Sequence, residues 1–150
     1  MRADGSAIVV EPLRKQDRER WETLARGYHT FYERILPDEV FSDTWNQLMA
    51  ATQIFGLGAR INGELAGITH FLFHPRIGFS DACYLQDLFV EERSRGTGIG
   101  RALIDAVAER AKMRGCSRLY WHTRENNLPA RALYETLATF DGFIRYDRHL

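Results

Sequence analysis

The chain has little lysine and little cysteine, no net charge and no long apolar run. Its 150 residues carry 20 Lys+Arg against 20 Asp+Glu, and 18 of the basic residues are arginine, with only Lys15 and Lys112 as lysines. Zero net charge argues against a general nucleic-acid binder, which usually has a marked basic excess. No run approaches the roughly 20 apolar residues that span a membrane. The segment Met1–Ala7 lacks the apolar core of a secretory signal. We therefore expect neither a nucleic-acid nor a membrane partner.

Cysteine and histidine usage excludes two further classes. Cys83 and Cys116 are too few for a disulfide framework, so the cytoplasm is the expected compartment. The five histidines show no spacing typical of a zinc site, and we expect no metal. A chain of this length buries roughly 68–70% of its unfolded surface, and we expect residues 1–150 to form one domain. The arginine bias reflects either genomic composition or charges at particular positions.

Apolar periodicity predicts a mixed α/β order of elements. Asn62-Gly63 lies between two apolar runs, which is a strong hairpin signal because both turn positions need positive φ. Pro75 to Ser80 is expected to be a loop. The predicted strands are 8–10, 55–61, 65–73, 83–90, 119–123 and 143–146, and the predicted helices are 15–36, 38–50, 99–115 and 129–138.

A glycine-rich segment, Arg95-Gly96-Thr97-Gly98-Ile99-Gly100-Arg101, joins a predicted strand to a predicted helix. Glycines let the backbone approach a ligand, and a helix start offers unpaired N–H groups and a positive dipole end. Together with Arg95 and Arg101 this favours a phosphate group. A Walker loop is excluded because Arg101 and Ala102 follow Gly100, and the dinucleotide fingerprint fails at its third glycine. The alternative is a tight loop without a ligand.

The same loop resembles the acetyl-CoA loop of the GNAT superfamily of N-acetyltransferases, whose pattern is Gln/Arg-x-x-Gly-x-Gly/Ala. Tyr84 to Val90 looks like that family's central strand, and Gly142-Phe143 matches a later Gly-Phe. The family's second motif is matched by Asn127, Ala130, Leu133 and Tyr134. Within the family, the pattern is similar to the diamine acetyltransferases and the Hpa-type histone, polyamine and amino-acid acetyltransferases. The resemblance implies a mixed central sheet that is splayed between its middle strands and has flanking helices.

The resemblance also implies where acetyl-CoA binds. The loop would hold the pyrophosphate and the backbone around Phe89 would hold the pantetheine. Tyr134 would contact the cofactor and give a proton to the departing thiolate. By pattern alone, Tyr134 could equally be a core tyrosine, and Asn127 a helix N-cap. The cofactor-binding residues so implied are Leu88, Phe89, Val90, Arg95, Gly96, Thr97, Gly98, Ile99, Gly100, Arg101, Asn127, Ala130 and Tyr134.

The residue that accepts the amine proton is less defined. Related diamine enzymes carry a glutamate where this chain has Gln86, and an amide cannot accept a proton at neutral pH. Asp87 follows, but on a regular strand Gln86 and Asp87 face opposite sides unless a bulge intervenes. Asp87 is the catalytic candidate beside Tyr134, either binding the substrate ammonium or acting through water; a surface aspartate is the alternative. The expected substrate-binding residues are Gln86, Asp87, Tyr32 and Glu33, with Asp38, Glu39, Asp81 and His122 as weaker site candidates.

The expected activity is transfer of acetyl from acetyl-CoA to a primary amine by direct attack in a ternary complex. The expected acceptor is a small molecule such as a polyamine or an amino-acid-like amine. A protein lysine, including a histone tail, is the alternative within this class. A non-catalytic acyl-CoA-binding module is the alternative outside it, because the glutamate is missing at Gln86. The resemblance is also compatible with a homodimer.

Overall fold

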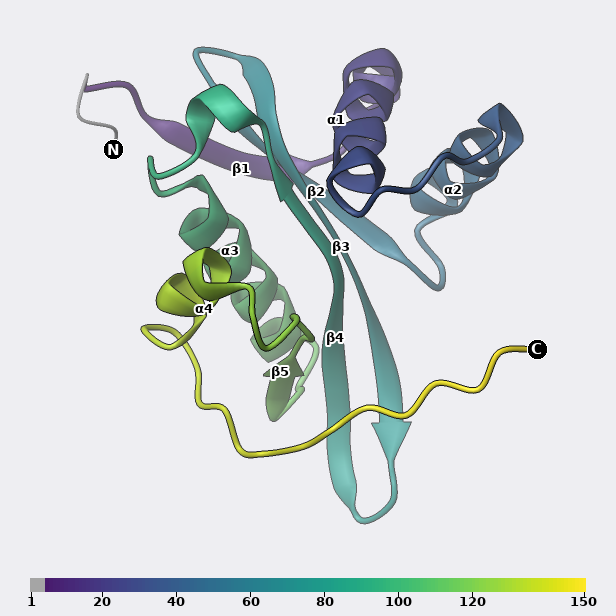
Figure 1. Ribbon diagram of the computed structural model, residues 1–150, viewed down its shortest axis with the longest axis vertical. Coiled ribbons are helices and arrows are strands. Elements are labelled where there is room, and N and C mark those ends of the chain that lie inside the picture. Colours follow the sequence, from purple (N-terminus) through teal and green to yellow (C-terminus); the bar gives the residue numbers. More distant parts are fainter. Residues whose placement is uncertain (1–4) are drawn as a thin grey trace.

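The computed structural model describes residues 5–150 (Figure 1). Asn62 and Gly63 have φ of 52° and 83°, so the predicted hairpin turn is confirmed. The strands are β1 (Ile8–Pro12), β2 (Phe55–Ile61), β3 (Glu64–Arg76), β4 (Phe79–Val90) and β5 (Arg118–Tyr120). The helices are α1 (Arg18–Phe31), α2 (Asp38–Ala50), α3 (Ile99–Met113) and α4 (Leu128–Tyr134), with short 3-10 turns η1 (Lys15–Asp17) and η2 (Glu92–Ser94). None of the helices described is long and apolar enough to cross a membrane.

The strands form one mixed sheet in the order β1-β2-β3-β4-β5. The first four pair antiparallel with their neighbours, and β5 pairs parallel with β4. α1 and α2 cover one face and α3 covers the other, as Figure 1 shows. The predicted α/β class, with a mixed central sheet and flanking helices, is therefore confirmed.

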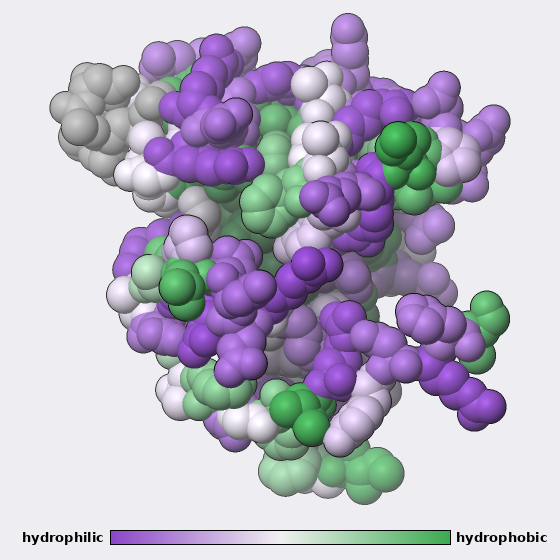
Figure 2. All heavy atoms as spheres, in the orientation of Figure 1, coloured by the Kyte–Doolittle hydropathy of each residue, from purple (hydrophilic) through white to green (hydrophobic). Residues whose placement is uncertain are grey.

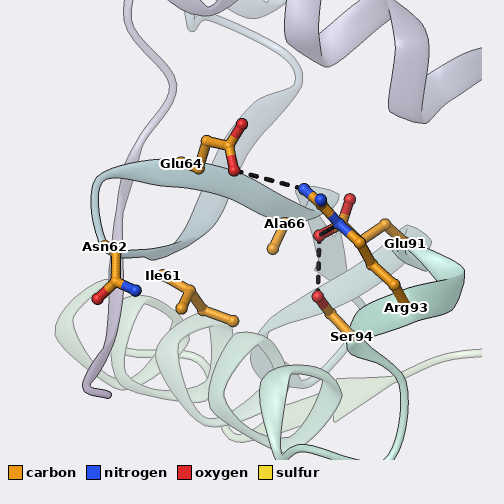
Figure 3. Close-up of a pocket in the computed structure, with 7 residues that line it drawn as sticks. All are labelled: Ile61, Asn62, Glu64, Ala66, Glu91, Arg93 and Ser94. Carbon is orange, nitrogen blue, oxygen red and sulfur yellow. Dashed lines mark hydrogen bonds and ion pairs between the residues drawn. The ribbon is translucent and has the colours of Figure 1, made fainter.

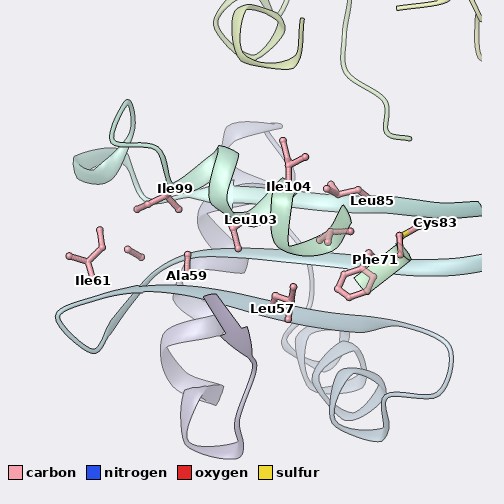
Figure 4. Packing of buried hydrophobic residues seen from close by; sticks show 12 residues of the cluster. Leu57, Ala59, Ile61, Phe71, Cys83, Leu85, Ile99, Leu103 and Ile104 are labelled. Atoms are coloured by element: carbon pink, nitrogen blue, oxygen red, sulfur yellow. The ribbon is translucent and has the colours of Figure 1, made fainter. Parts of the chain in front are cut away.

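Each face of the sheet has its own core. Under α3, the apolar side chains of Leu103 and Val107 are fully buried against β2, β3 and β4 (Figure 4). Under α1 and α2, Trp21, Leu24 and Phe41 pack on Ile68. Burial of several such side chains, each contributing about 1.5–3 kcal/mol, is what holds the helices on the sheet.

β4 carries an extra residue at Gln86. Asp87 pairs with His70 and Leu85 pairs with Phe71, so Gln86 has no partner across the β3–β4 ladder. This bulge shifts the alternation of side chains along the strand by one residue. As a result, odd-numbered Leu85 and even-numbered Leu88 both pack on the α3 side. The pairing of β4 with β5 ends at Tyr84 and Tyr120. The sheet therefore opens along β4 from the bulge onward.

Several expectations about the elements were wrong. The helix expected over 129–138 ends at Tyr134, and the strand expected over 119–123 ends at Tyr120. The first helix ends at Phe31 and not near Leu36, because the chain turns at Glu33 with a φ of 55°. The expected loop from Pro75 to Ser80 is mostly strand, since bulges let the long β3–β4 hairpin continue to a turn at Ile77-Gly78. The expected strand 143–146 is absent, because this segment lies extended without a ladder partner in the described chain.

Hydrophobic side chains are exposed at two ends of the fold. Ile77 and Phe79 are exposed at the tip of the β3–β4 hairpin. This tip is at the bottom of Figure 1, and the surface at the bottom of Figure 2 is hydrophobic. The segment after α4, yellow in Figure 1, exposes a second group. Its exposed members are Phe140, Phe143, Ile144 and Tyr146.

Candidate active site

The loop before α3 exposes a series of backbone donors. Gly96 and Gly98 have φ of 73° and 94°, a conformation that L side chains rarely adopt, and Gly98 is the N-cap of α3. Within the described residues, the amides of residues 96–101 have no hydrogen-bond acceptor, and the first α3-type bond runs from the Ala102 N–H to the Gly98 carbonyl. A Cβ added at Gly96 would meet nothing within 4 Å, so the space in front of the loop is open. These donors fit a phosphate.

The arginines of this loop have partners within the protein. The Arg95 guanidinium donates from Nε to the Val90 carbonyl at 3.1 Å and lies over the Phe31 and Phe89 rings. Arg101 donates to Thr136 Oγ1 at 2.8 Å. The groups of this loop that fit an anion are therefore the backbone amides at the start of α3, while Arg95 and Arg101 are bonded to other parts of the chain.

The open edge of β4 lies beside this loop. Leu88 and Val90 turn their side chains to the α3 core, whereas Phe89 packs on the α1 side. No described strand pairs with the outer edge of this segment, because β5 reaches only Tyr84. An extended ligand can therefore run along β4 as a strand would, next to the loop that would hold its phosphates.

α4 approaches the loop through its apolar residues. A Cβ on Gly100 would lie 3.2 Å from Leu133 Cδ2, so α3 and α4 touch closely at this glycine. Asn127 occupies the N-cap position of α4 without a side-chain cap, and its Nδ2 faces Thr123 Oγ1 at 3.3 Å. Ala130 is half-buried on the same helix.

Tyr134 ends α4 and lies against Trp121, with their ring centroids 5.4 Å apart. Burial, followed by the neighbouring Tyr32, raises the pKa of Tyr134. A raised pKa keeps the phenol protonated at neutral pH, which a proton donor requires.

A cavity of about 260 Å³ lies on the other side of β4, between α1, α2 and the sheet. Its lining is largely apolar, with Asp87 and His70 contributed by the sheet and Tyr28 and His29 by α1. Tyr28 lies beside the Asp87 carboxylate, and burial together with this negative charge raises the pKa of Tyr28. Burial, followed by Arg34, lowers the pKa of His29, which is therefore neutral at pH 7. Asp87 is the carboxylate of this cavity.

Tyr32 connects the two sides of the site. Its ring centroid lies 5.0 Å from that of Tyr28, and its hydroxyl is near enough to Tyr134 to contribute to the raised pKa there. The structure thus brings Asp87, Tyr32 and Tyr134 into one region at the opening of the sheet.

Other predicted residues are exposed or bonded to other groups. Gln86 is exposed at the bulge, and Glu33 is exposed in the turn after α1. Asp38 forms an ion pair with Arg26 at 2.6 Å. His122 bonds the Tyr84 hydroxyl at 2.9 Å on the surface beside β5.

A second cavity, of about 340 Å³, lies between the β2–β3 turn and η2 (Figure 3). Arg93 enters it and pairs with Glu91 at 3.0 Å and with Glu64 at 3.4 Å. Burial raises the pKa of Glu91, but hydrogen bonds from Arg93, Ser94 and Arg20 outweigh it and leave that pKa lowered. The charges of this cavity are therefore mutually neutralised, and Arg93 is turned away from the loop amides.

Comparison of the chain with known protein families and proteins identifies its family. The acetyltransferase (GNAT) family model matches residues 18–140. The D-amino-acid N-acetyltransferase HPA3 of Saccharomyces cerevisiae is 32% identical over 95% of this chain and 91% of its own length. The chain belongs to the GNAT acetyltransferase family.

Two further relatives of this acetyltransferase differ in their named acceptors. The spermine/spermidine N(1)-acetyltransferase of Bacillus subtilis is 28% identical over 61% of this chain and 63% of its own length. The ribosomal-protein-alanine N-acetyltransferase of Brucella melitensis has a similar structure, with a TM-score of 0.81 and 27% identity over 96% of this chain and all of its own length. The activity of this chain is transfer of an acetyl group to an amine.

Sequence reasoning overlooked the buried polar residues of the acetyltransferase. Tyr28 and His70 contact Asp87, and Trp21 contacts His70. Trp21 and Tyr28 have the spacing of core residues, and the sequence favours a packed or solvated role for His70. The sequence gives one indication of the contact between His70 and Asp87, which is that the two residues lie on consecutive predicted strands.

Proposed function

We propose that the protein transfers acetyl from acetyl-CoA to the primary amine of a small molecule, either amino-acid-like or a polyamine. The observation that carries this proposal is the position of Asp87, a carboxylate with a side chain 27% exposed that lines a cavity of about 260 Å³. A cavity of this size suits a small amine better than a protein segment. The names of HPA3 and of the Bacillus relative support the two acceptor types.

The donor side uses backbone groups. The amides of residues 96–101 hold the pyrophosphate, the open edge of β4 at Leu88, Phe89 and Val90 holds the pantetheine, and Asn127 and Ala130 border it. Bound acetyl-CoA supplies the acetyl thioester. Glycine at Gly98 allows the turn that aims the amides.

The acceptor side uses Asp87 and Tyr134. The Asp87 carboxylate binds the ammonium and removes its proton, so that the nitrogen lone pair becomes available. Tyr134 holds a proton on its hydroxyl oxygen, and its raised pKa keeps it there until negative charge develops on the sulfur. Tyr32, between them, borders the acceptor.

We also propose that residues 1–150 act as one domain, in the cytoplasm, as a homodimer. The unpaired Cys83 and Cys116 are compatible with a reducing compartment. The exposed Phe143 and Ile144 after α4 support association of two copies, because apolar groups gathered on a surface favour contacts. Sedimentation velocity of the purified chain checks the dimer.

An acceptor screen tests the activity. Purified protein with acetyl-CoA should release free thiol when amino acids or polyamines are added; release only with a lysine-containing peptide would favour the protein-directed alternative. Tyr134→Phe should lower kcat about 100-fold and affect acetyl-CoA affinity much less, because it removes a proton donor and keeps the ring. Asp87→Asn should raise the amine KM and lower kcat. Unchanged turnover in either variant removes that residue from the mechanism.

A further inference from the structure

A buried histidine bridges a tryptophan and the Asp87 carboxylate. The Trp21 Nε1–H group lies 2.9 Å from His70 Nε2, and His70 Nδ1 lies 2.9 Å from Asp87 Oδ2. Trp21 is 1% exposed and His70 is 5% exposed. Both nitrogen atoms of His70 therefore have a defined partner inside the fold.

These partners determine the tautomer of the ring. An indole N–H can only donate, so His70 Nε2 accepts and carries no proton. The single proton of the neutral imidazole is then on Nδ1, where it donates to Asp87. Trp21 is itself held by Trp45, whose ring centroid lies 5.1 Å away.

The bulge at Gln86 brings this aspartate to the histidine. It makes Asp87 the direct ladder partner of His70 and turns the carboxylate toward α1. The Asp87 carbonyl also accepts a hydrogen bond from Thr69 Oγ1 at 2.8 Å, which fixes the backbone. Tyr28 contacts the carboxylate from α1. Thr69, His70 and Tyr28 therefore fix the orientation of the Asp87 carboxylate and of its remaining lone pairs.

We propose that His70 is a positioning residue for the acceptor amine: it orients Asp87 through Nδ1–H, and Trp21 holds it in that tautomer. The inference rests on the proposed role of Asp87. In the proton transfer, an N–H bond of the ammonium breaks, an O–H bond forms on Asp87, and the electron pair stays on the nitrogen. His70 remains neutral throughout, donating to Asp87 without exchanging its proton.

The test compares three histidine variants. His70→Leu removes both hydrogen bonds and should lower kcat/KM for the amine about 10- to 100-fold, with the larger part in the amine KM. His70→Gln should recover most of this loss, because its amide can both donate to Asp87 and accept from Trp21. His74→Leu, on the same strand but bonded to Tyr120, is the matched control and should resemble the parent. Acetyl-CoA affinity should be unchanged in all three.

Comparison with Asp87→Asn separates the two proposals. If His70 acts through Asp87, then His70→Leu added to Asp87→Asn should cause little further loss of activity. Loss with Asp87→Asn but not with His70→Leu would overturn the positioning role alone. Full activity of Asp87→Asn would overturn the role of Asp87. A His70→Leu loss that His70→Gln fails to recover in folded protein would also contradict positioning.

A pH profile tests the tautomer. The titratable groups around His70 are Asp87 on β4 and Tyr28 and His29 on α1; the α2 residues in the cavity do not titrate. Trp21→Phe leaves Nε2 free to bind a proton, so the pH profile of kcat/KM should gain a titrating group that the parent lacks. The double variant Trp21→Phe/His70→Gln should lack that group. Identical pH profiles for Trp21→Phe and Trp21→Phe/His70→Gln would contradict the inference. If Trp21→Phe does not fold, the comparison of His70→Gln with His70→Leu tests the positioning role of His70.

Discussion

Beneath α3, the sheet is packed with aliphatic side chains such as Leu103 and Val107, whereas beneath α1 the apolar groups surround His70 and Asp87. The α3 face supports a loop whose chemistry comes from its backbone. The α1 face carries its chemistry on side chains, and a buried polar atom that loses its partner there costs about 1–3 kcal/mol. In the proposed function, donor binding thus depends on chain conformation, and acceptor binding depends on a side-chain network.

The largest effect should come from the conformation of the loop. Gly98→Val places a β-branched residue at a φ of 94° and should abolish acetyl-CoA binding, because the amides no longer converge. Gly115→Val is the control, since Gly115 has a φ of 83°, has open space within 4 Å of where a Cβ would lie, and follows the far end of α3. Thermal stabilisation by acetyl-CoA should disappear only in Gly98→Val. Retained stabilisation would contradict the role of the loop.

Two leucines, one on each face, should separate stability from function. Leu103→Ala and Leu24→Ala each remove a buried side chain, 0% and 2% exposed, and each should cost about 2–5 kcal/mol in the free energy of unfolding. Leu24→Ala should also raise the amine KM, because α1 holds Trp21 and Tyr28 in place. Leu103→Ala should leave the amine KM unchanged. Equal amine KM values in the two variants would show that the faces are not functionally distinct.

The smallest effect concerns His29. Its pKa is lowered by burial and then by Arg34, so the unfolded chain binds this proton more readily than the folded protein. The contribution to stability is present above the ordinary histidine pKa of about 6.5 and is lost as the pH falls below it. Lowering the pH from about 7.5 to about 5.5 should reduce the melting temperature, and His29→Gln should reduce that dependence. If His29→Gln leaves the pH dependence of the melting temperature unchanged, that dependence belongs to other titratable groups.

Local signals predicted much of the fold. The Asn62-Gly63 turn, the helix 38–50 and the glycines before α3 follow from residue types that dictate the backbone. The pairing of His70 with Asp87 could not be predicted in this way. A count from the Ile77-Gly78 turn without bulges places His70 opposite Leu85, and the two bulges of the hairpin shift its partner to Asp87. The final strand was predicted from Phe143 to Tyr146, but apolar alternation there has no neighbouring strand to pair with among the described residues.

The bulge at Gln86 works as a change of phase within one strand. Before it, odd-numbered residues such as Cys83 and Leu85 face α3; after it, even-numbered Leu88 and Val90 do. If Gln86 instead occupied a regular ladder position, the two faces would be exchanged for the rest of the strand and Asp87 would turn away from His70. A protein engineer who transplants this site into another sheet must move residues 82–90 as one block, because the register of the strand, more than any single side chain, carries the information.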